Sequence, residues 1–188
     1  YGGTFLSFTY LASILQDVTG FSANAVSGVL LVYGVSVAIG NLWGGRLADR
    51  RGPIPALKLI FALLAAVLFV LTFTAYNTWL VLLTVLALGA VAFGNVPGLQ
   101  VYVVKQAQRF APQAADVASG LNIAAFNVGI ALGASLGGLV VDHFGLMHTP
   151  WLGALVVMGA FGLTAWSGRL DRRDGVADRA EGIAVSAH

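Results

Sequence analysis

The ten residues Gly44-Gly45-Arg46-Leu47-Ala48-Asp49-Arg50-Arg51-Gly52-Pro53 decide the fold, because they separate two long apolar runs. The run before them, residues 26–44, is long enough to cross a bilayer, which takes about 20 apolar residues at a rise of 1.5 Å each. The charges that follow are costly in hydrocarbon and mark where the chain leaves it. Gly52, Pro53 and Pro55 then break the helix and let the chain turn back. The stretch predicts a short basic turn between two transmembrane helices.

The composition indicates a membrane protein. Of the 188 residues, 58% are hydrophobic and only 10% are charged, and the mean hydropathy is +0.85. An average soluble domain is roughly 25% charged, so this composition excludes an ordinary soluble domain. The absence of cysteine excludes a disulfide framework and a thiolate metal site.

Six apolar spans follow one another, and they predict an all-α membrane protein. They cover residues 4–15, 26–45, 55–75, 78–104, 117–141 and 150–167. The first span is short: even counted from Tyr1, it reaches only about 22 Å of the roughly 30 Å hydrocarbon core. We therefore expect a fragment that starts inside a helix. Residues 1–167 are expected to form one bundle, and the polar residues 168–188 to form a disordered cytoplasmic tail.

The positions of the basic residues predict the topology. All ten Lys and Arg residues follow the second, fourth and sixth spans, and the turns after the other three spans contain none. Because basic residues accumulate in cytoplasmic loops, we expect these three loops and the C-terminus to be cytoplasmic. The ten are Arg46, Arg50, Arg51, Lys58, Lys105, Arg109, Arg169, Arg172, Arg173 and Arg179.

The deciding stretch also carries a family resemblance. Gly45-x-Leu47-Ala48-Asp49-Arg50-x-Gly52 resembles the cytoplasmic-loop signature of the major facilitator superfamily, G-x-L-A-D-R-x-G followed by basic residues. Pro53-Ile54 stand where the family usually has Arg or Lys, and this ending resembles the version between its eighth and ninth helices. The text Asn127-Val128-Gly129-Ile130-Ala131-Leu132-Gly133 resembles the eleventh helix of drug- and sugar-efflux members.

The resemblance implies the C-terminal half, helices seven to twelve, of a twelve-helix transporter similar to bacterial drug- or sugar-efflux proton antiporters. It implies multi-pass insertion in the plasma (inner) membrane and efflux of a small molecule by alternating access. The implied partners are a small-molecule substrate, the lipid bilayer and a missing N-terminal half. Uptake by a symporter of the same fold remains an alternative, as does a six-span oligomeric scaffold or channel subunit.

The loop motif consists of Gly45, Asp49, Arg50 and Gly52. A carboxylate at Asp49 can cap the N-terminus of a nearby helix and interact with its dipole, and Arg50 can pair with that carboxylate. These charges alternatively serve only to orient the protein in the membrane. The resemblance implies that Asp49 helps to latch one half of the transporter against the other on the cytoplasmic side.

Glycines mark a contact face in the fifth span, where Gly129, Gly133 and Gly137 follow at intervals of four. Such glycines stack on one face of a helix and let another backbone approach closely. This pattern predicts either static helix packing or a smooth surface for sliding. We also expect the third span, which is apolar on all faces, to contact lipid, and the second, fourth and fifth spans to face protein or a cavity.

Five polar residues are candidates for lining a substrate cavity. Asn95 lies in Gly94-Asn95-Val96-Pro97-Gly98, where the proline removes a hydrogen bond and kinks the helix. Its amide either satisfies a freed carbonyl or contacts substrate at the broken helix. Tyr102, seven residues on, shares its face. The same two roles, an interhelical hydrogen bond or contact with a ligand, are open to Tyr10, Asn122 and Asn127.

The sequence offers no catalytic machinery. No Asp, Glu, Lys or Arg lies at membrane depth, since Lys58 is in the first turn of its span and Asp17, Asp116 and Asp142 all stand at span ends. Ionisable groups at membrane depth usually serve as proton relays or substrate counter-charges, so we expect the proton-coupling group in the missing half. His143 and His148 with Asp142 make a poor metal site. We predict no enzyme activity, no cofactor, no metal and no nucleic-acid partner.

Overall fold

The computed structural model describes the backbone of residues 1–186 and the side chains of residues 1–171. Within residues 1–186 all regular structure is helical, which confirms the predicted all-α class. The helices are α1 (Gly2–Phe8), α2 (Leu11–Ser13), α3 (Ala23–Arg51), α4 (Pro53–Thr74), α5 (Thr78–Ala92), α6 (Asn95–Phe110), α7 (Ala115–Phe144) and α8 (His148–Ser186). A π-helical turn (Ile14–Val18) follows α2, and a 3-10 turn (Pro112–Ala114) precedes α7.

Five of the six predicted spans reach membrane-crossing length in the described residues. They are α3, α4, the run Thr78–Phe110 that joins α5 and α6, the run Pro112–Phe144 that contains α7, and His148–Asp171 of α8. The predicted first span, residues 4–15, is divided among α1, α2 and the π-helical turn. It is too short to count among the five, as its residue count indicates.

Local sequence signals explain where the helices begin and end. The Ser22 hydroxyl accepts a hydrogen bond from the Ala25 N–H at 3.3 Å and caps α3. The side chain of Asn77 likewise accepts from the N–H groups of Trp79 and Leu80 and caps α5. Gly52, with φ of 82°, ends α3, and Pro53 begins α4 at once. A positive φ costs glycine little, so the predicted turn forms where its glycine and proline stand.

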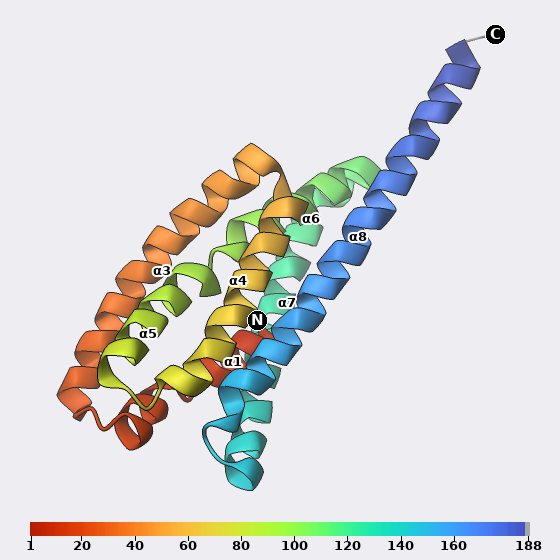
Figure 1. Ribbon diagram of the computed structural model, residues 1–188. Helices are drawn as coiled ribbons and strands as arrows, with labels where there is room; N and C mark the ends of the chain where they lie inside the picture. The colour runs from red at the N-terminus through yellow and green to blue at the C-terminus, as the bar shows by residue number, and fades with distance from the viewer. Residues whose placement is uncertain (187–188) are drawn as a thin grey trace.

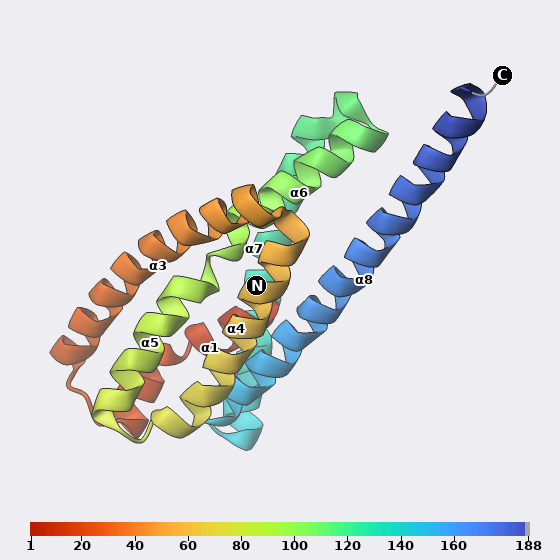
Figure 2. The same cartoon turned by 45° about the horizontal axis from the view of Figure 1, so that its top comes forward.

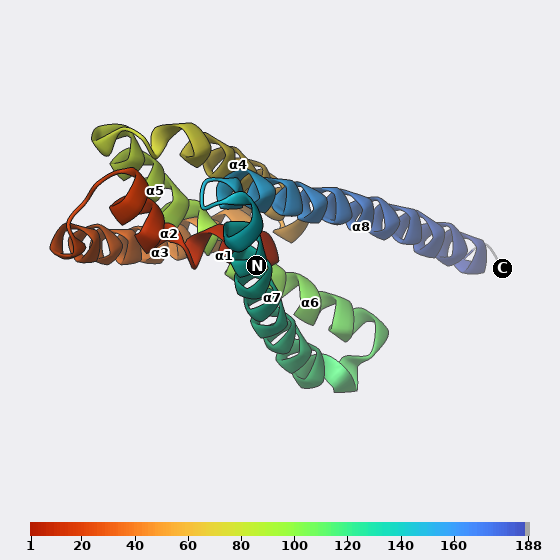
Figure 3. The same cartoon turned by 90° about the horizontal axis from the view of Figure 1, so that it is seen from below.

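The helices run back and forth along one bundle (Figure 1). The α3–α4 turn, the α6–α7 turn and the extended end of α8 lie at one end (Figure 1), which we call the basic end because every described Lys and Arg side chain belongs to its segments. The views in Figures 2 and 3 show α3 beside α5 and α8 extending past the bundle. The short α1 packs mainly against α7 and α8.

Much of the core forms on one side of α4. Its residues Leu57, Ile60, Leu64, Leu68 and Leu71 are at most 1% exposed. In the apolar stretch of α4, 44% of the residues are buried, against 17% in α3 and 11% in α7. A helix that is apolar all round suits a protein core as well as lipid. α4 therefore has a central, buried face, while α3 and α7 are more exposed. Its other face carries exposed Phe69, Val70 and Phe73, and the expected contact of this helix with lipid stays a prediction.

The last helix continues past the predicted end of the last span. α8 is helical from His148 to Ser186, whereas the sixth span is predicted to end at residue 167. The division into a bundle (residues 1–167) and a disordered cytoplasmic tail (residues 168–188) stays a prediction. Residues 187 and 188 of that tail lie outside the described residues.

Candidate functional site

The fourth span is broken near its middle. α5 ends at Ala92 and α6 begins at Asn95, with Phe93 and Gly94 between them. Pro97, in the first turn of α6, has no N–H to donate, so the break falls where the sequence predicts a kink. At the break the Val96 N–H instead donates to the Phe93 carbonyl at 3.1 Å.

α3 lies directly against this break. A Cβ atom on Gly40 would overlap the backbone oxygen of Ala90, and one on Gly44 would overlap that of Gly94. Both glycines are buried. Only a residue without a side chain permits such an approach between helix backbones. The glycines of α3 therefore hold the broken span in place from one side.

Asn95 is 2% exposed and lies at the break. Its Nδ2 donates to the Ala92 carbonyl at 3.3 Å, which is the local role that the sequence offered as one alternative. Its Oδ1 is buried and accepts no hydrogen bond within the described part of the chain. An unpaired buried acceptor costs about 1–3 kcal/mol, so Asn95 keeps one acceptor available at the break.

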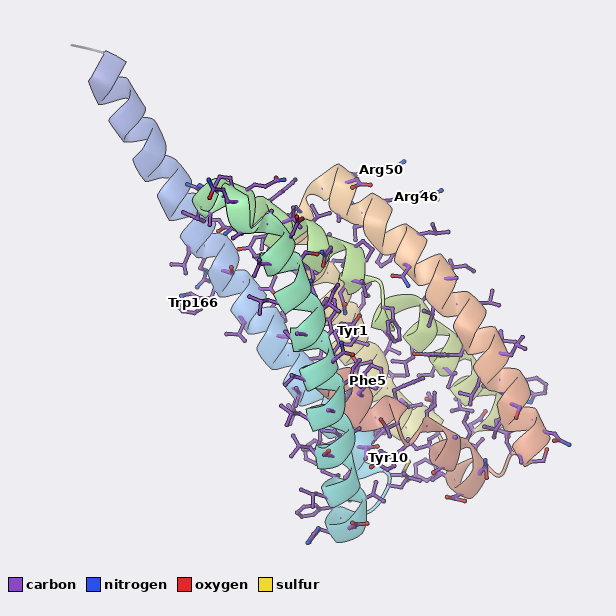
Figure 4. All side chains as sticks on the ribbon, turned by 180° about the vertical axis from the view of Figure 1, so that it is seen from behind. Tyr1, Phe5, Tyr10, Arg46, Arg50 and Trp166 are labelled. Atoms are coloured by element: carbon purple, nitrogen blue, oxygen red, sulfur yellow. The ribbon has the colours of Figure 1, made fainter. Side chains whose placement is uncertain are left out.

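Aromatic rings from α1 and its N-cap, from the break itself and from α7 gather beside the break. Tyr1 lies 5.8 Å from Phe93 and 4.6 Å from Phe126 of α7, measured between ring centroids. Phe5 of α1 also lies 6.2 Å from Phe93. Figure 4 shows Tyr1 and Phe5 in the space that α7 faces, on the side toward α3 and α5. We call these four residues, which are all half-buried, the aromatic cluster.

Tyr102 takes part in a hydrogen-bond network between α6 and α8. Its hydroxyl lies 2.7 Å from the Ser167 Oγ and donates to Asp171 Oδ2 at 3.0 Å. Gln106, one turn further along α6, donates its Nε2 to Asp171 Oδ1 at 3.0 Å. Tyr102 thus joins two helices near the basic end and does not share a site with Asn95.

Asn122 takes part in a second network, between α6 and α7. Its Nδ2 donates to Gln100 Oε1 at 2.8 Å, and the Gln100 Nε2 in turn donates to the Ser119 hydroxyl. Asn127 behaves differently: it is exposed and donates to the Ile123 carbonyl of its own helix at 3.0 Å. These two asparagines therefore do not act together in this structure.

Tyr10 lies on the other side of the break, away from the basic end (Figure 4). Its hydroxyl donates to the Ala134 carbonyl of α7 at 3.0 Å, and its ring covers Gly137. Nearby, the Ser7 hydroxyl donates to the Thr149 carbonyl of α8 at 2.8 Å. These bonds tie the first segment of the chain to the last two helices.

α1 packs against the face of α7 that carries the glycines. A Cβ atom on Gly133 would overlap the Gly2 backbone, and one on Gly137 would lie 2.7 Å from the Leu6 carbonyl oxygen. Gly129 lies against Tyr1, where a Cβ atom would be 3.2 Å from the tyrosine Cβ. The backbones of α1 and α7 thus approach closely along the three glycines that the sequence singled out.

The loop motif is open at the basic end. Asp49 and Arg50 are exposed, and neither side chain forms a hydrogen bond or ion pair with another residue among those whose side chains are described. Arg46 and Arg50 point away from the bundle (Figure 4). Gly45 and Gly52 are partly buried. The pairing of Asp49 with Arg50 that the motif permits is not formed here.

Sequence reasoning missed several residues that the structure brings together. Gln100, Gln106 and Asp171 supply most of the bonds of the two networks. The signal was present, because Tyr102 and Gln106 are four residues apart and share a helix face. In the aromatic cluster only Tyr1 and Phe5 share such a spacing, because Phe93 and Phe126 come from other elements.

The comparison with known proteins agrees with the fold and the loop motif. The family described as the Major Facilitator Superfamily matches residues 1–182. An uncharacterized MFS-type transporter of Bacillus subtilis strain 168, YtbD, is 58% identical over 93% of the chain and 44% of its own length. The inner membrane transport protein YdhP of Escherichia coli K12 is 36% identical over 89% of the chain and 42% of its length. A probable sugar efflux transporter of Pasteurella multocida is 31% identical over 85% of the chain and 38% of its own length. The chain thus spans less than half the length of these relatives.

Proposed function

The chain belongs to the major facilitator superfamily, and on that premise we propose that it acts in proton-coupled efflux of a small molecule by alternating access. We further propose that it contributes the C-terminal half, helices seven to twelve, of a twelve-helix transporter in the plasma membrane. In this proposal the basic end faces the cytoplasm, as the positive-inside rule favours. The name of the Pasteurella relative supports efflux as the direction.

The aromatic cluster at the break in the fourth span carries this proposal. Substrate sites of transporters tend to lie near the bilayer midplane, where a spanning helix is interrupted. Binding sites for small molecules are mostly apolar and aromatic, with a few polar groups that fix orientation. Phe93 and Phe126 match the aromatic part of that pattern with half-buried rings, and Asn95, two residues from Phe93, has an unpaired acceptor in its Oδ1, which is buried in this structure. We therefore propose an uncharged substrate with a flat apolar face.

The two hydrogen-bond networks support a moving part. Gln100, Tyr102 and Gln106 link α6 to α7 and α8, and all three lie on the basic side of the break. On the other side of the break α5 packs against α3 and α4. α6 packs against α3 and α4 as well, so the hydrogen bonds to α7 and α8 are what distinguishes it from α5, and we propose that the break between α5 and α6 acts as a hinge.

Efflux is tested in cells that express the complete transporter and lack their own major efflux pumps. Panels of small aromatic compounds and sugars are supplied, and intracellular accumulation is followed with and without a protonophore. We expect lower accumulation of at least one compound, restored by the protonophore. Higher accumulation in expressing cells would instead indicate uptake, and insensitivity to the protonophore would remove proton coupling from the proposal.

The aromatic cluster is tested in the same assay with Phe126→Ala. Loss of one ring contact, worth about 0.5–1.5 kcal/mol, should raise the half-saturating concentration about two- to tenfold. The matched control is Phe73→Ala, because Phe73 of α4 also pairs with a neighbouring ring, that of Phe69, but is 65% exposed on the outside of the bundle. Equal effects of the two variants would show that the aromatic cluster does not bind the substrate.

A further inference from the structure

An outward-facing groove runs along the seam between α4 and α8. Its volume is about 350 Å³, and its lining is apolar, with Ala62 and Phe69 from α4 and Trp151, Ala154 and Met158 from α8. Phe69 is 53% and Met158 48% exposed. Both helices are long and apolar enough to cross a membrane. Whatever fills the groove there must come from the hydrocarbon region of the bilayer.

Two cations lie at the basic end of this seam. Lys58 stands four residues before Ala62 and eleven before Phe69, and eleven residues are close to three full helical turns. Lys58 therefore shares the groove-facing side of α4. By the same spacing Arg169 shares the side of α8 that carries Met158. Neither cation has a hydrogen bond or ion pair with another residue among the described side chains.

A second hollow, of about 380 Å³, adjoins Lys58 between the same two helices. Gly168 and Ile54 line it and are in close contact, since a Cβ atom on Gly168 would lie 2.6 Å from the Ile54 side chain. Asp171 also lines it, but its two carboxylate oxygens accept hydrogen bonds from Tyr102 and Gln106 of α6. The carboxylate is thus hydrogen-bonded to α6 and forms no ion pair with Lys58 among the described side chains, so the Lys58 ammonium can still contact an anionic group from outside.

The length of the seam matches one leaflet. From Lys58 to Phe69 the helix rises about 16 Å, which is half of the roughly 30 Å hydrocarbon core. A phospholipid with its phosphate at the level of Lys58 would therefore extend an acyl chain along the groove as far as Phe69. Basic pockets between transmembrane helices are known to suit anionic lipid headgroups.

We propose that the α4–α8 seam binds one anionic phospholipid from the leaflet on the basic side. Its phosphate lies between Lys58 and Arg169, and one acyl chain fills the groove beside Ala62 and Ala154. The two cations favour a negatively charged headgroup, and the small alanine side chains make room for the acyl chain. This site lies on the outside of the bundle, apart from the aromatic cluster, so it does not depend on the proposed transport function.

The headgroup contact is tested by native mass spectrometry of the delipidated protein, titrated with phosphatidylglycerol or with phosphatidylcholine. We expect one phosphatidylglycerol per protein to be retained. The double variant Lys58→Gln, Arg169→Gln should lose affinity for it by about tenfold or more. The matched control Arg46→Gln, Arg51→Gln removes two exposed charges from the same end of the bundle, on α3, and should bind as the wild type does. Equal retention of phosphatidylcholine, or equal losses in both double variants, would overturn the proposal.

The acyl-chain contact is tested with Ala62→Leu, Ala66→Leu, which fills the groove with both cations intact. Both alanines line the groove and are exposed toward it, so leucine can be accommodated, and the circular dichroism spectrum checks folding. We expect loss of the retained phosphatidylglycerol. The control Ala38→Leu, Ala131→Leu places the same side chains on exposed faces of α3 and α7 and should retain the lipid. A dimer that dissociates when the groove is filled, with no lipid retained by the wild type, would overturn the proposal in favour of a second copy.

Discussion

Gln106 donates a hydrogen bond of 3.0 Å to Asp171, 65 residues later in the chain, and so joins α6 to α8. The Tyr102 hydroxyl donates to the other oxygen of the same carboxylate at 3.0 Å. Hydrogen bonds to a charged group contribute about 1.5–3 kcal/mol each, more than bonds between neutral groups. This carboxylate is therefore the strongest polar link that we find between the broken span and the last helix.

Replacing Asp171 by Ala should lower the stability of the protein in detergent micelles. Both α6 donors would lose a charged acceptor, and we expect a loss of about 2 kcal/mol in the free energy of unfolding. Equilibrium unfolding followed by circular dichroism measures the change. Asp142→Ala is the control, because Asp142 is exposed and has no side-chain partner among the described residues. Indistinguishable stabilities of the two variants would contradict the importance of the link.

Replacing Gly44 by Ala should destabilise the contact between α3 and the break. The new methyl group would overlap the Gly94 backbone, and such overpacking costs about 1–3 kcal/mol. Gly34→Ala on the same helix meets no atom within 4 Å and should be neutral or stabilising, because alanine favours helix by about 0.5–1 kcal/mol over glycine. The unfolding experiment described above compares them, and a stable Gly44→Ala variant would mean that α3 can move away from the break at little cost.

The orientation is tested by labelling single cysteines, which is simple because the chain has none of its own. If the basic end is cytoplasmic, His148→Cys should react with a membrane-impermeant maleimide in intact cells. Arg51→Cys should react only after the cells are opened. Both positions are exposed in the structure, so a difference reports sidedness. The reverse pattern would invert the orientation.

The loop motif is tested with Asp49→Asn in the complete transporter. We expect reduced transport with unchanged membrane insertion, because the charge is not needed for crossing the membrane. Asp49 has no side-chain partner among the described residues, which leaves its carboxylate available to another segment. Asp142→Asn is the control, and both insertion and transport are measured. Wild-type transport by the Asp49 variant would leave this residue with no role beyond orientation.

The sequence predicted where the helices begin and end better than how they pack against one another. Apolar length, Gly52 and Pro53 determine where spans end, and these are local properties that the structure confirms. The central place of α4 could not be read in this way, because leucine packs against lipid and against protein alike. The aromatic cluster depends on Tyr1, Phe93 and Phe126, which meet only through tertiary packing. Asn95 could be predicted as a polar group at a kink, but its burial and its unpaired Oδ1 depend on tertiary packing.

The position of α1 has a consequence for the order in which the protein can assemble. Ser7 bonds to the carbonyl of Thr149, which the ribosome adds 142 residues later. Synthesis at about 5–20 residues per second makes this delay on the order of ten seconds. Throughout that interval α1 lacks its main partners, because most of its contacts are with α7 and α8, although Phe8 can already stack on Tyr33 of α3. Membrane chaperones and proteases therefore have access to α1 before most of its packing exists.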